Sequence, residues 1–193
     1  MKFLDKKTIK IDRELNELDK FVLKFTKILE KHTDYVIISG YVSILLGRSR
    51  ATEDIDIFIK PISRDSFKKL YDDLIRAGFW CLNAEGADKI YANLTDKIAV
   101  RFSEKEKVIP NFEVKIVGNV LEADAFNSRI IAKLNIGDLK ISSLERQIAF
   151  KRYYLGDEKD IEDAKHIETL FKDRLDISLI ENYKKMIESF KKK

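Results

Sequence analysis

Two aspartates, Asp54 and Asp56, lie two positions apart in the apolar run "EDIDIFI". An unpaired carboxylate is very costly to bury, so something must offset the charge of both side chains. Residues two apart on a strand point the same way, with their Cα atoms roughly 6.6 Å apart. Two carboxylates that converge from one face can share divalent metal ions. We therefore predict a metal site on this strand.

A second short stretch, Ser39-Gly40, has the features of a phosphate-binding turn. An apolar strand, "YVIIS", ends there, and a short helix, "GYVSILLG", begins at once. The exposed N–H groups and the positive end of a helix favour a bound phosphate, Gly40 permits close backbone approach, and the Ser39 hydroxyl can donate to a phosphate oxygen. A phosphate site beside a two-metal carboxylate pair indicates phosphoryl transfer.

The elements that must position these residues follow from hydrophobic periodicity. Apolar residues at three- and four-residue steps predict a helix from Asp12 to His32, and period-two alternation predicts strands at "EDIDIFI" and "NFEVKIV". We also expect a helix at "SRDSFKKLYDDLIRAG", strands at "FWCLN" and "KIAVRFS", a loop around "AEGADK", and a hairpin that turns at Gly137-Asp138. Three helices follow. The sequence thus predicts an α+β fold, with an α/β core over residues 1–141 and a helical C-terminal part over residues 142–193.

Composition limits the class of protein. With 193 residues, 45% of them hydrophobic, the chain can bury a core as one domain, or as one domain plus a helical appendage. No apolar run reaches membrane-spanning length, and the first residues lack the apolar region of a signal peptide, so we expect no membrane partner. The single Cys81 cannot form an internal disulfide, which favours a cytoplasmic location. A net charge of +4 does not by itself indicate nucleic-acid binding.

The run "SG…RSRATEDIDI" resembles the signature of the polymerase-β-type nucleotidyltransferase superfamily, in which two small residues and a short helix precede Arg-x-Thr-x-Asp-hydrophobic-Asp. A second run, "LERQIAFKRYYLGDEKDIEDAKHI", is similar to a helical motif of a small prokaryotic branch that includes AbiEii-type abortive-infection toxins and uncharacterised archaeal relatives. The motif residues matched here are Lys151, Lys159, Asp160 and Asp163. Ser39 departs from the commoner Gly. The resemblance implies the superfamily's minimal fold, a mixed sheet with flanking helices.

The resemblance also implies a metal-binding set. Asp54 and Asp56 would bind two Mg²⁺ ions, with Mn²⁺ as an alternative, and the ions would also bind the triphosphate of an NTP. A third carboxylate completes such sites and helps to deprotonate the attacking hydroxyl. Glu113 in "NFEVKIV" alternates out of phase with its apolar neighbours and is our candidate, although the family more often has Asp. Glu104 and Glu106 are the fallbacks.

Further residues are candidates for binding the nucleotide and its phosphates. By resemblance, Lys151 would reach the triphosphate from the helical part, and Asp160 or Asp163 would orient Lys151 or bind nucleotide. Arg50 is a further candidate for phosphate contact. So is Thr52, which also suits a local hydrogen bond that shapes the turn.

Each of these residues has an ordinary structural alternative. Asp54 and Asp56 taken alone also fit an exposed edge strand, and Glu113 fits a half-exposed strand face. Lys151 fits a solvated helix position. Asp160 and Asp163 can favour the start of a helix electrostatically. The two arginines of "RSRAT" either contact phosphates or form ion pairs with the acidic residues that follow them, Glu53 and Asp54.

Three functions from different classes fit this reading. The favoured one is a Mg²⁺-dependent nucleotidyltransferase that moves a nucleoside monophosphate from an NTP to a hydroxyl on a tRNA 3′ end, a protein side chain or a small molecule. Such an enzyme is a candidate for the toxin of a toxin–antitoxin pair, with an antitoxin protein as its partner. The alternatives are a non-catalytic nucleotide-binding regulator and an antitoxin-like interaction protein on the same fold.

Overall fold

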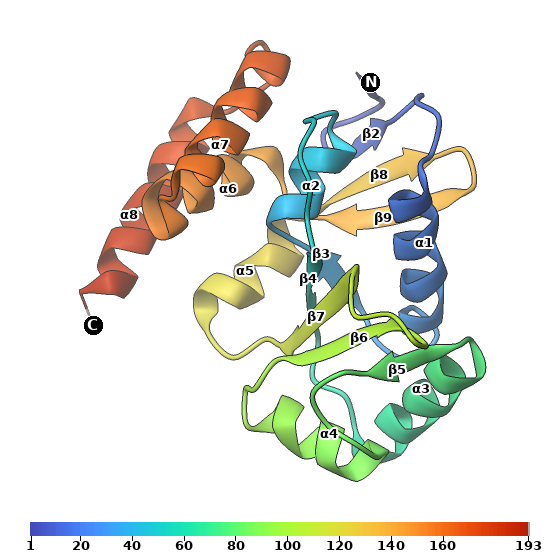
Figure 1. Cartoon of the computed structure of the whole chain (residues 1–193). Helices are drawn as coiled ribbons and strands as arrows, with labels where there is room; N and C mark the ends of the chain where they lie inside the picture. Colours follow the sequence, from blue (N-terminus) through green and yellow to red (C-terminus); the bar gives the residue numbers. More distant parts are fainter. Residues whose placement is uncertain (193) are drawn as a thin grey trace.

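The strand that carries the two aspartates, β4 (Asp54–Ile59), lies inside a nine-stranded mixed sheet, as the computed structural model of residues 1–192 shows (Figure 1). The strand order is β1-β2-β8-β9-β3-β4-β7-β6-β5. The other strands are β1 (Lys2–Phe3), β2 (Thr8–Lys10), β3 (Tyr35–Ile37), β5 (Phe79–Cys81), β6 (Val100–Glu104), β7 (Asn111–Ile116), β8 (Ile130–Leu134) and β9 (Gly137–Ile141).

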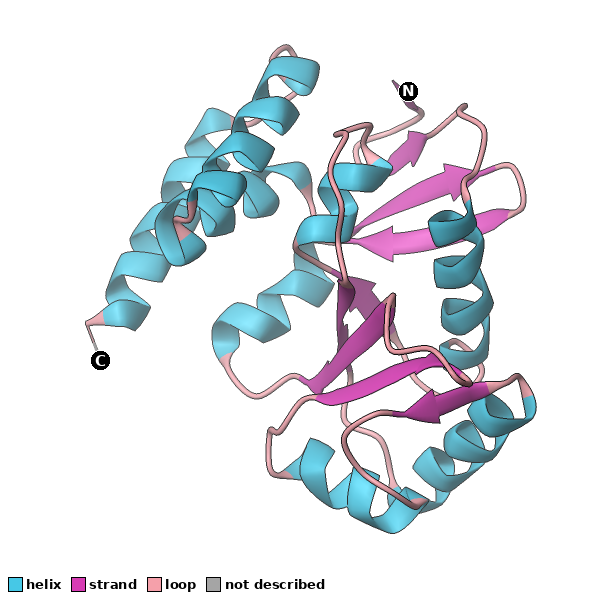
Figure 2. Ribbon diagram, viewed as in Figure 1, coloured by secondary structure: helices cyan, strands magenta, loops and turns pink. Residues whose placement is uncertain are grey.

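Helices cover both faces of this sheet (Figure 2). They are α1 (Glu17–Leu29), α2 (Gly40–Leu45), α3 (Arg64–Arg76), α4 (Ala87–Thr95), α5 (Val120–Ser128), α6 (Leu144–Ala149), the π-helical η1 (Phe150–Leu155), α7 (Glu158–Phe171) and α8 (Ile177–Lys191). After β9 every described element is helical. The α+β class predicted from the sequence, a mixed sheet with flanking helices and a helical C-terminal portion, is confirmed. None of the helices within residues 1–192 has the length and apolar character needed to cross a bilayer.

The core lies between the sheet and α1. Ile55 and Ile57 of β4 are 0% and 1% exposed on this face. In β7, the ring of Phe112 stacks between two α1 side chains, with centroid distances of 4.5 Å to Phe21 and 3.9 Å to Phe25. Because side chains alternate along a strand, this burial turns the polar residues of β4 and β7 to the opposite face. That face looks toward α5 and the C-terminal helices (Figure 1).

Several boundaries differ from the sequence prediction. Helix α1 begins at Glu17 rather than Asp12, because Asn16 and Asp19 form a capping box in which each side chain accepts a hydrogen bond from the other's backbone N–H at 2.9 Å. The predicted loop around "AEGADK" runs directly into the nine-residue helix α4. Helix α5 and the strands β1 and β2 were not predicted. The hairpin is confirmed as β8 and β9, but its turn is at residues 135–136, two positions before the predicted Gly137-Asp138, which are instead the first residues of β9.

A buried carboxylate on α1 fixes the helix that follows the Ser39-Gly40 turn. Asp19 is 0% exposed and accepts a forked contact from Arg13, with Nη1 at 2.6 Å and Nη2 at 2.8 Å. The hydroxyl of Tyr41, in the first turn of α2, donates to the same carboxylate at 2.9 Å. Burial and the negative charge of Asp19 raise the pKa of Tyr41 well above its ordinary value, so the hydroxyl stays a donor. This contact ties α2 to α1.

Tyr41→Phe should therefore lower the free energy of unfolding by about 1.5 kcal/mol, the usual scale for a lost hydrogen bond to a charged group. Urea denaturation at pH 7 measures the change. Tyr154→Phe, at a side chain that is 41% exposed, is the matched control and should change stability by less than about 0.5 kcal/mol. Equal effects of the two variants would contradict the role given to the Tyr41 hydroxyl.

Candidate active site

Three carboxylates share the face of the sheet opposite α1. Asp54 and Asp56 alternate with buried isoleucines along β4. Strand β7 runs parallel to β4 and sets Asn111 opposite Asp54, and Glu113 opposite Asp56. Cross-strand partners of a sheet project from the same face, so Glu113 lies beside the aspartate pair. We call the face defined by Asp54, Asp56 and Glu113 the carboxylate face.

Glu113 is held by two cations. Its carboxylate lies 2.8 Å from Nη2 of Arg101, across the sheet on β6, and 2.5 Å from Nζ of Lys115, two residues along β7. Burial raises the pKa of Glu113, but the contacts with Lys115 and Arg101 outweigh burial and hold the pKa below its usual range. Within residues 1–192, no group of three or more His, Cys, Asp or Glu side chains is arranged to hold a metal ion. Glu113 is thus beside the aspartates but is engaged by cations.

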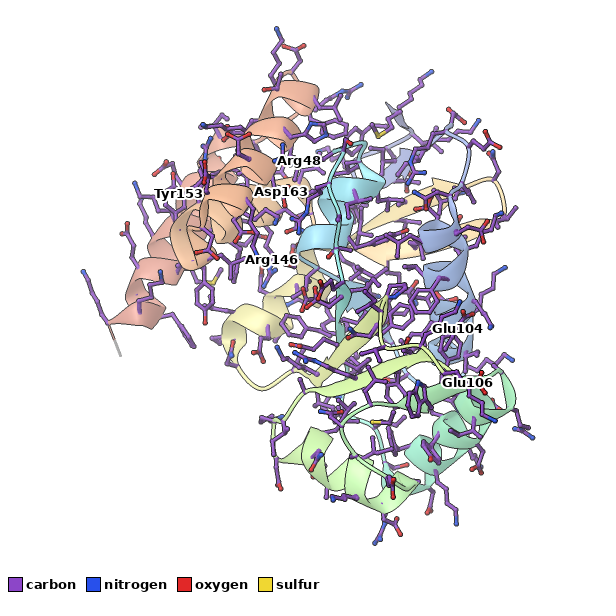
Figure 3. The ribbon with its side chains drawn as sticks, in the orientation of Figure 1. Arg48, Glu104, Glu106, Arg146, Tyr153 and Asp163 are labelled. Atoms are coloured by element: carbon purple, nitrogen blue, oxygen red, sulfur yellow. The ribbon has the colours of Figure 1, made fainter. Side chains whose placement is uncertain are left out.

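The two fallback carboxylates lie elsewhere. Glu104 points toward α1, where Nζ of Lys24 lies 3.0 Å away, and it also contacts Nζ of Lys107 at 2.8 Å. Glu106 is exposed in the turn after β6. Figure 3 places both residues at this turn, apart from Arg146 and Asp163. Of the three candidates for the third carboxylate, only Glu113 is on the carboxylate face.

The charges placed together on this face disfavour the ionised form of Asp56. Its pKa rises to about 6, because burial, the charge of Asp54 and the charge of Glu113 all disfavour ionisation. Lys115 and the side chain of Ser39 act in the opposite direction and do not cancel the rise. The carboxylate face therefore has an uncompensated negative charge at neutral pH.

The turn at Ser39-Gly40 is strained. Ser39 has φ 62° and ψ −136°, a backbone conformation that residues other than glycine rarely adopt. Its carbonyl accepts a hydrogen bond from Nε2 of Gln147 on α6 at 3.3 Å. At the next residue, a Cβ on Gly40 would meet Nη2 of Arg50 at 3.1 Å, so glycine makes room for this guanidinium. The Gly preferred by the resembled family at position 39 matches the backbone geometry found here.

The two arginines between α2 and β4 bind a carboxylate of the helical part. We call residues 46–53 the arginine loop. Nη1 of Arg50 lies 2.6 Å from Oδ2 of Asp163 on α7. Nε of Arg48 lies 2.6 Å from Oδ1 of the same residue, and Figure 3 labels Arg48 and Asp163. Neither arginine pairs with the acidic residues that follow it in the loop, within the described chain. Thr52 donates to the carbonyl of Asp54 at 2.9 Å and so shapes the entry into β4.

Lys151 is enclosed by carboxylates. It is 0% exposed, and its Nζ lies 2.9 Å from Oδ1 of Asp160 and 2.7 Å from Oδ2 of Asp163. Burial raises the pKa of Asp163, but Lys151 and Arg50 outweigh burial and lower it below the ordinary value. Asp163 therefore stays ionised, and the ion cluster around it joins η1 and α7 to the arginine loop.

A cavity of about 290 Å³ opens beside Asp56, between the carboxylate face and the C-terminal helices. Arg146 and Gln147 of α6 line it and are only 3% and 2% exposed. The guanidinium of Arg146 lies 3.8 Å from the ring centre of Phe150, and burial lowers the pKa of Arg146 to about 10. Tyr154 completes this wall with an aromatic ring. The cavity therefore offers both apolar and cationic surface next to a carboxylate.

Apart from Ser39 and Asp56, sequence reasoning did not single out the residues that line this cavity. Lys115 could have been found, because it lies two positions after Glu113 on an alternating strand and so shares its face. Arg146, Gln147 and Phe150 gave no signal of their own, since their place beside β4 depends on how α6 packs on the core.

Solved structures share this fold. The solution structure of the antibiotic-resistance factor ANT(2″)-Ia matches with a TM-score of 0.55 and 17% identity, over 88% of this chain and 90% of its own. The crystal structure of ANT(2″)-Ia in complex with adenylyl-2″-tobramycin matches with a TM-score of 0.55 and 16% identity, over 88% and 96%. An antigenic nucleotidyltransferase-like protein from Paracoccidioides brasiliensis matches with a TM-score of 0.51 and 16% identity, over 85% and 83%.

At these identities the likeness is one of fold. It agrees with the nucleotidyltransferase fold implied by the residues around Ser39 and Asp54. No protein-family model matches the sequence, and no curated protein matches it significantly. The narrower resemblance to AbiEii-type proteins therefore stays a prediction.

The raised pKa of Asp56 predicts how stability depends on pH. Well below pH 4 the carboxyl is neutral in both the folded and the unfolded chain. Between pH 4 and about 6 the unfolded chain loses this proton first, so the folded state becomes less stable as pH rises. Asp56→Asn should stabilise the metal-free protein by about 3 kcal/mol at pH 8 and by little at pH 4. Urea denaturation in EDTA at both pH values measures this.

The matched control for this prediction is Asp72→Asn, at an exposed aspartate on α3, which should change stability little at either pH. An Asp56→Asn protein that is no more stable than wild type at pH 8 would show that this carboxylate is not destabilised by its surroundings.

The strain at Ser39 predicts a second stability effect. Ser39→Gly should raise the free energy of unfolding by about 1 kcal/mol, because glycine adopts a positive φ without strain. Ser39→Ala is the control, since it also removes the hydroxyl but keeps the strain, and it should give no gain. Thermal unfolding of the two variants distinguishes backbone strain from loss of the hydroxyl. A similar gain in both variants would contradict the strain argument.

Proposed function

We propose that this chain is a nucleotidyltransferase that moves a nucleoside monophosphate from an NTP to a hydroxyl group and releases pyrophosphate. The observation that carries the proposal is the carboxylate face. Asp54 and Asp56 lie on one side of β4, with Glu113 directly opposite Asp56 across the parallel pairing with β7. Burying Asp56 beside two other carboxylates costs stability, and this arrangement is hard to explain as a structural device.

The fold comparisons support a nucleotide as one substrate. One solved neighbour is in complex with adenylyl-2″-tobramycin, a small molecule that carries an adenylyl group. For the present chain we therefore consider a small molecule as acceptor, alongside a tRNA 3′ end or a protein side chain. The cavity beside Asp56 is the proposed place for the acceptor, because it opens next to the carboxylate that Glu113 faces.

The donor atoms of the carboxylate face suit a hard divalent cation, which Asp54 and Asp56 would hold together with Glu113 once its carboxylate leaves Arg101 or Lys115. The donors are carboxylate oxygens, which Mg²⁺ and Mn²⁺ prefer. The raised pKa of Asp56 indicates that the protein's own cations do not fully balance the negative charge there. Asp54, Asp56 and Glu113 are the residues that would hold the proposed ions. When bound, such ions would neutralise charge on the phosphates of the NTP.

The remaining steps fall to side chains of this chain. The acceptor oxygen forms a bond to the α-phosphorus while the bond to the β-phosphate oxygen breaks, and pyrophosphate leaves. Glu113 takes the proton of the attacking hydroxyl, which requires its carboxylate to leave Arg101 or Lys115. The Ser39 hydroxyl and the guanidinium of Arg50 contact the phosphates of the NTP before pyrophosphate leaves.

One observation favours a second candidate function. Because Glu113 is already paired with Arg101 and Lys115, the chain also fits a regulator that binds NTP through Asp54 and Asp56 without transferring it. An antitoxin-like interaction protein on the same fold needs neither turnover nor NTP. Direct binding and turnover measurements on one preparation distinguish the three.

The test is incubation of the purified protein with each labelled NTP and Mg²⁺, in separate reactions with total RNA, cellular protein and a small-molecule extract. Label should move to one acceptor class and should not move with Asp54→Asn or Asp56→Asn. Transfer to none of them, with NTP still bound, would favour the regulator. Growth arrest on expression that also depends on Asp56 would support the toxin role.

Glu113→Gln separates the enzyme from the regulator. It should leave binding of the Mg²⁺–NTP complex within about threefold of wild type and lower the single-turnover transfer rate by at least about a hundredfold, because a general base is lost. Glu113→Asp should be milder, since it keeps a carboxylate. Lys115→Gln, which frees Glu113 from one cation, is the companion variant and should not abolish transfer. Wild-type transfer in Glu113→Gln would remove Glu113 from the mechanism.

A further inference from the structure

The ion cluster around Asp163 on α7 brings three cations to one carboxylate. Lys151, Arg48 and Arg50 all contact Asp163, and Lys151 and Arg50 share one atom, Oδ2, at 2.7 Å and 2.6 Å. Asp160 gives Lys151 a second partner. Glu162 lies 3.8 Å from Nη1 of Arg48 and is its second carboxylate. Arg50 has only its share of Asp163.

Lys151 is not placed to meet a ligand directly. Its ammonium is inside the protein, in contact with two carboxylates, and removing it from them would leave buried charges unpaired. Its surroundings favour a role that acts through Asp163.

Arg50 has the opposite character. Its guanidinium lies against Gly40, in a space that any larger residue at position 40 would narrow, and next to the strained Ser39. Its Nε donates to the carbonyl of Ala51 at 3.2 Å and its Nη1 contacts Asp163, while Nη2 has no protein acceptor within residues 1–192. Since a guanidinium presents a planar fork of N–H groups, the free edge suits a phosphate.

We infer that Lys151 is a positioning residue that prepares Arg50 for the triphosphate of the NTP. Lys151 neutralises Asp163 from the protein interior and fixes its carboxylate. Asp163 can then orient Arg50, while the positive charge of Arg50 stays available to a phosphate. Removing Lys151 would leave Arg48 and Arg50 as the cations on Asp163, so that Asp163 would hold Arg50 more strongly. This inference rests on the proposed function, because it takes an NTP as the ligand of Arg50.

A double-mutant cycle on NTP binding tests the inference without requiring turnover. Titration calorimetry with each of the four NTPs in the presence of Mg²⁺ identifies a nucleotide that binds wild type. Arg50→Ala and Lys151→Met should each raise its Kd by at least about tenfold, the scale of a lost charge-assisted hydrogen bond. In the double variant the Kd should stay within about twofold of Arg50→Ala alone, because Lys151 acts only through Arg50.

Arg152→Met is the matched control. Arg152 is the neighbour of Lys151 on η1 and forms a different ion pair with α7, to Glu168. If Lys151 merely docked α7, loss of either ion pair would weaken binding alike. We expect Arg152→Met to keep the Kd within about twofold of wild type and Lys151→Arg to restore part of the affinity. Thermal unfolding of every variant shows which are folded, and Asp163→Asn replaces Lys151→Met if the latter is not.

The outcomes separate this inference from the proposed function. If no NTP binds wild type, the proposed function fails and the inference fails with it. If an NTP binds but the effects of Arg50→Ala and Lys151→Met multiply in the double variant, Lys151 contacts the nucleotide independently and only the inference is overturned. Equal losses in Lys151→Met and Arg152→Met overturn it as well.

Discussion

Repulsion among three carboxylates on one face of the sheet is the constraint to which the surrounding structure responds. The alternation that buries Ile55 on one face leaves no other direction for Asp54 and Asp56, and the parallel register of β7 brings Glu113 opposite them. The backbone hydrogen bonds of the sheet keep these side chains together. Lys115 on the same sheet and the side chain of Ser39 reduce the repulsion at Asp56 but do not remove it.

The helical part contributes to the site through contacts with the core rather than by covering it loosely. Gln147 on α6 donates to the carbonyl of Ser39, and Asp163 on α7 binds both arginines of the arginine loop. These contacts reach the Ser39-Gly40 turn and the segment that leads into β4. The geometry of the proposed phosphate site is therefore shared between two regions more than a hundred residues apart in the sequence.

Local patterns sufficed to predict the α+β class, the strand bearing Asp54 and Asp56, and the hairpin of β8 and β9. They did not predict α4, whose buried side chains are few, or α5, whose apolar residues do not gather on one face. Strand alternation predicted that Glu113 lies on the polar face of its strand. It did not predict that Glu113 lies opposite Asp56, because the pairing of β4 with β7 is a tertiary contact. Asp163 as the partner of Arg50 was likewise beyond local patterns, as the contact spans 113 positions.

The strand order limits how much backbone the sheet offers to a strand from another molecule. A sheet of nine strands exposes two edges, and an open edge is a template for a strand from another molecule. Here the edges are β1, with two residues, and β5, with three. The longer strands β4, β6 and β7 are paired on both sides, so the sheet can be wide enough to carry the site while offering very little backbone for intermolecular pairing.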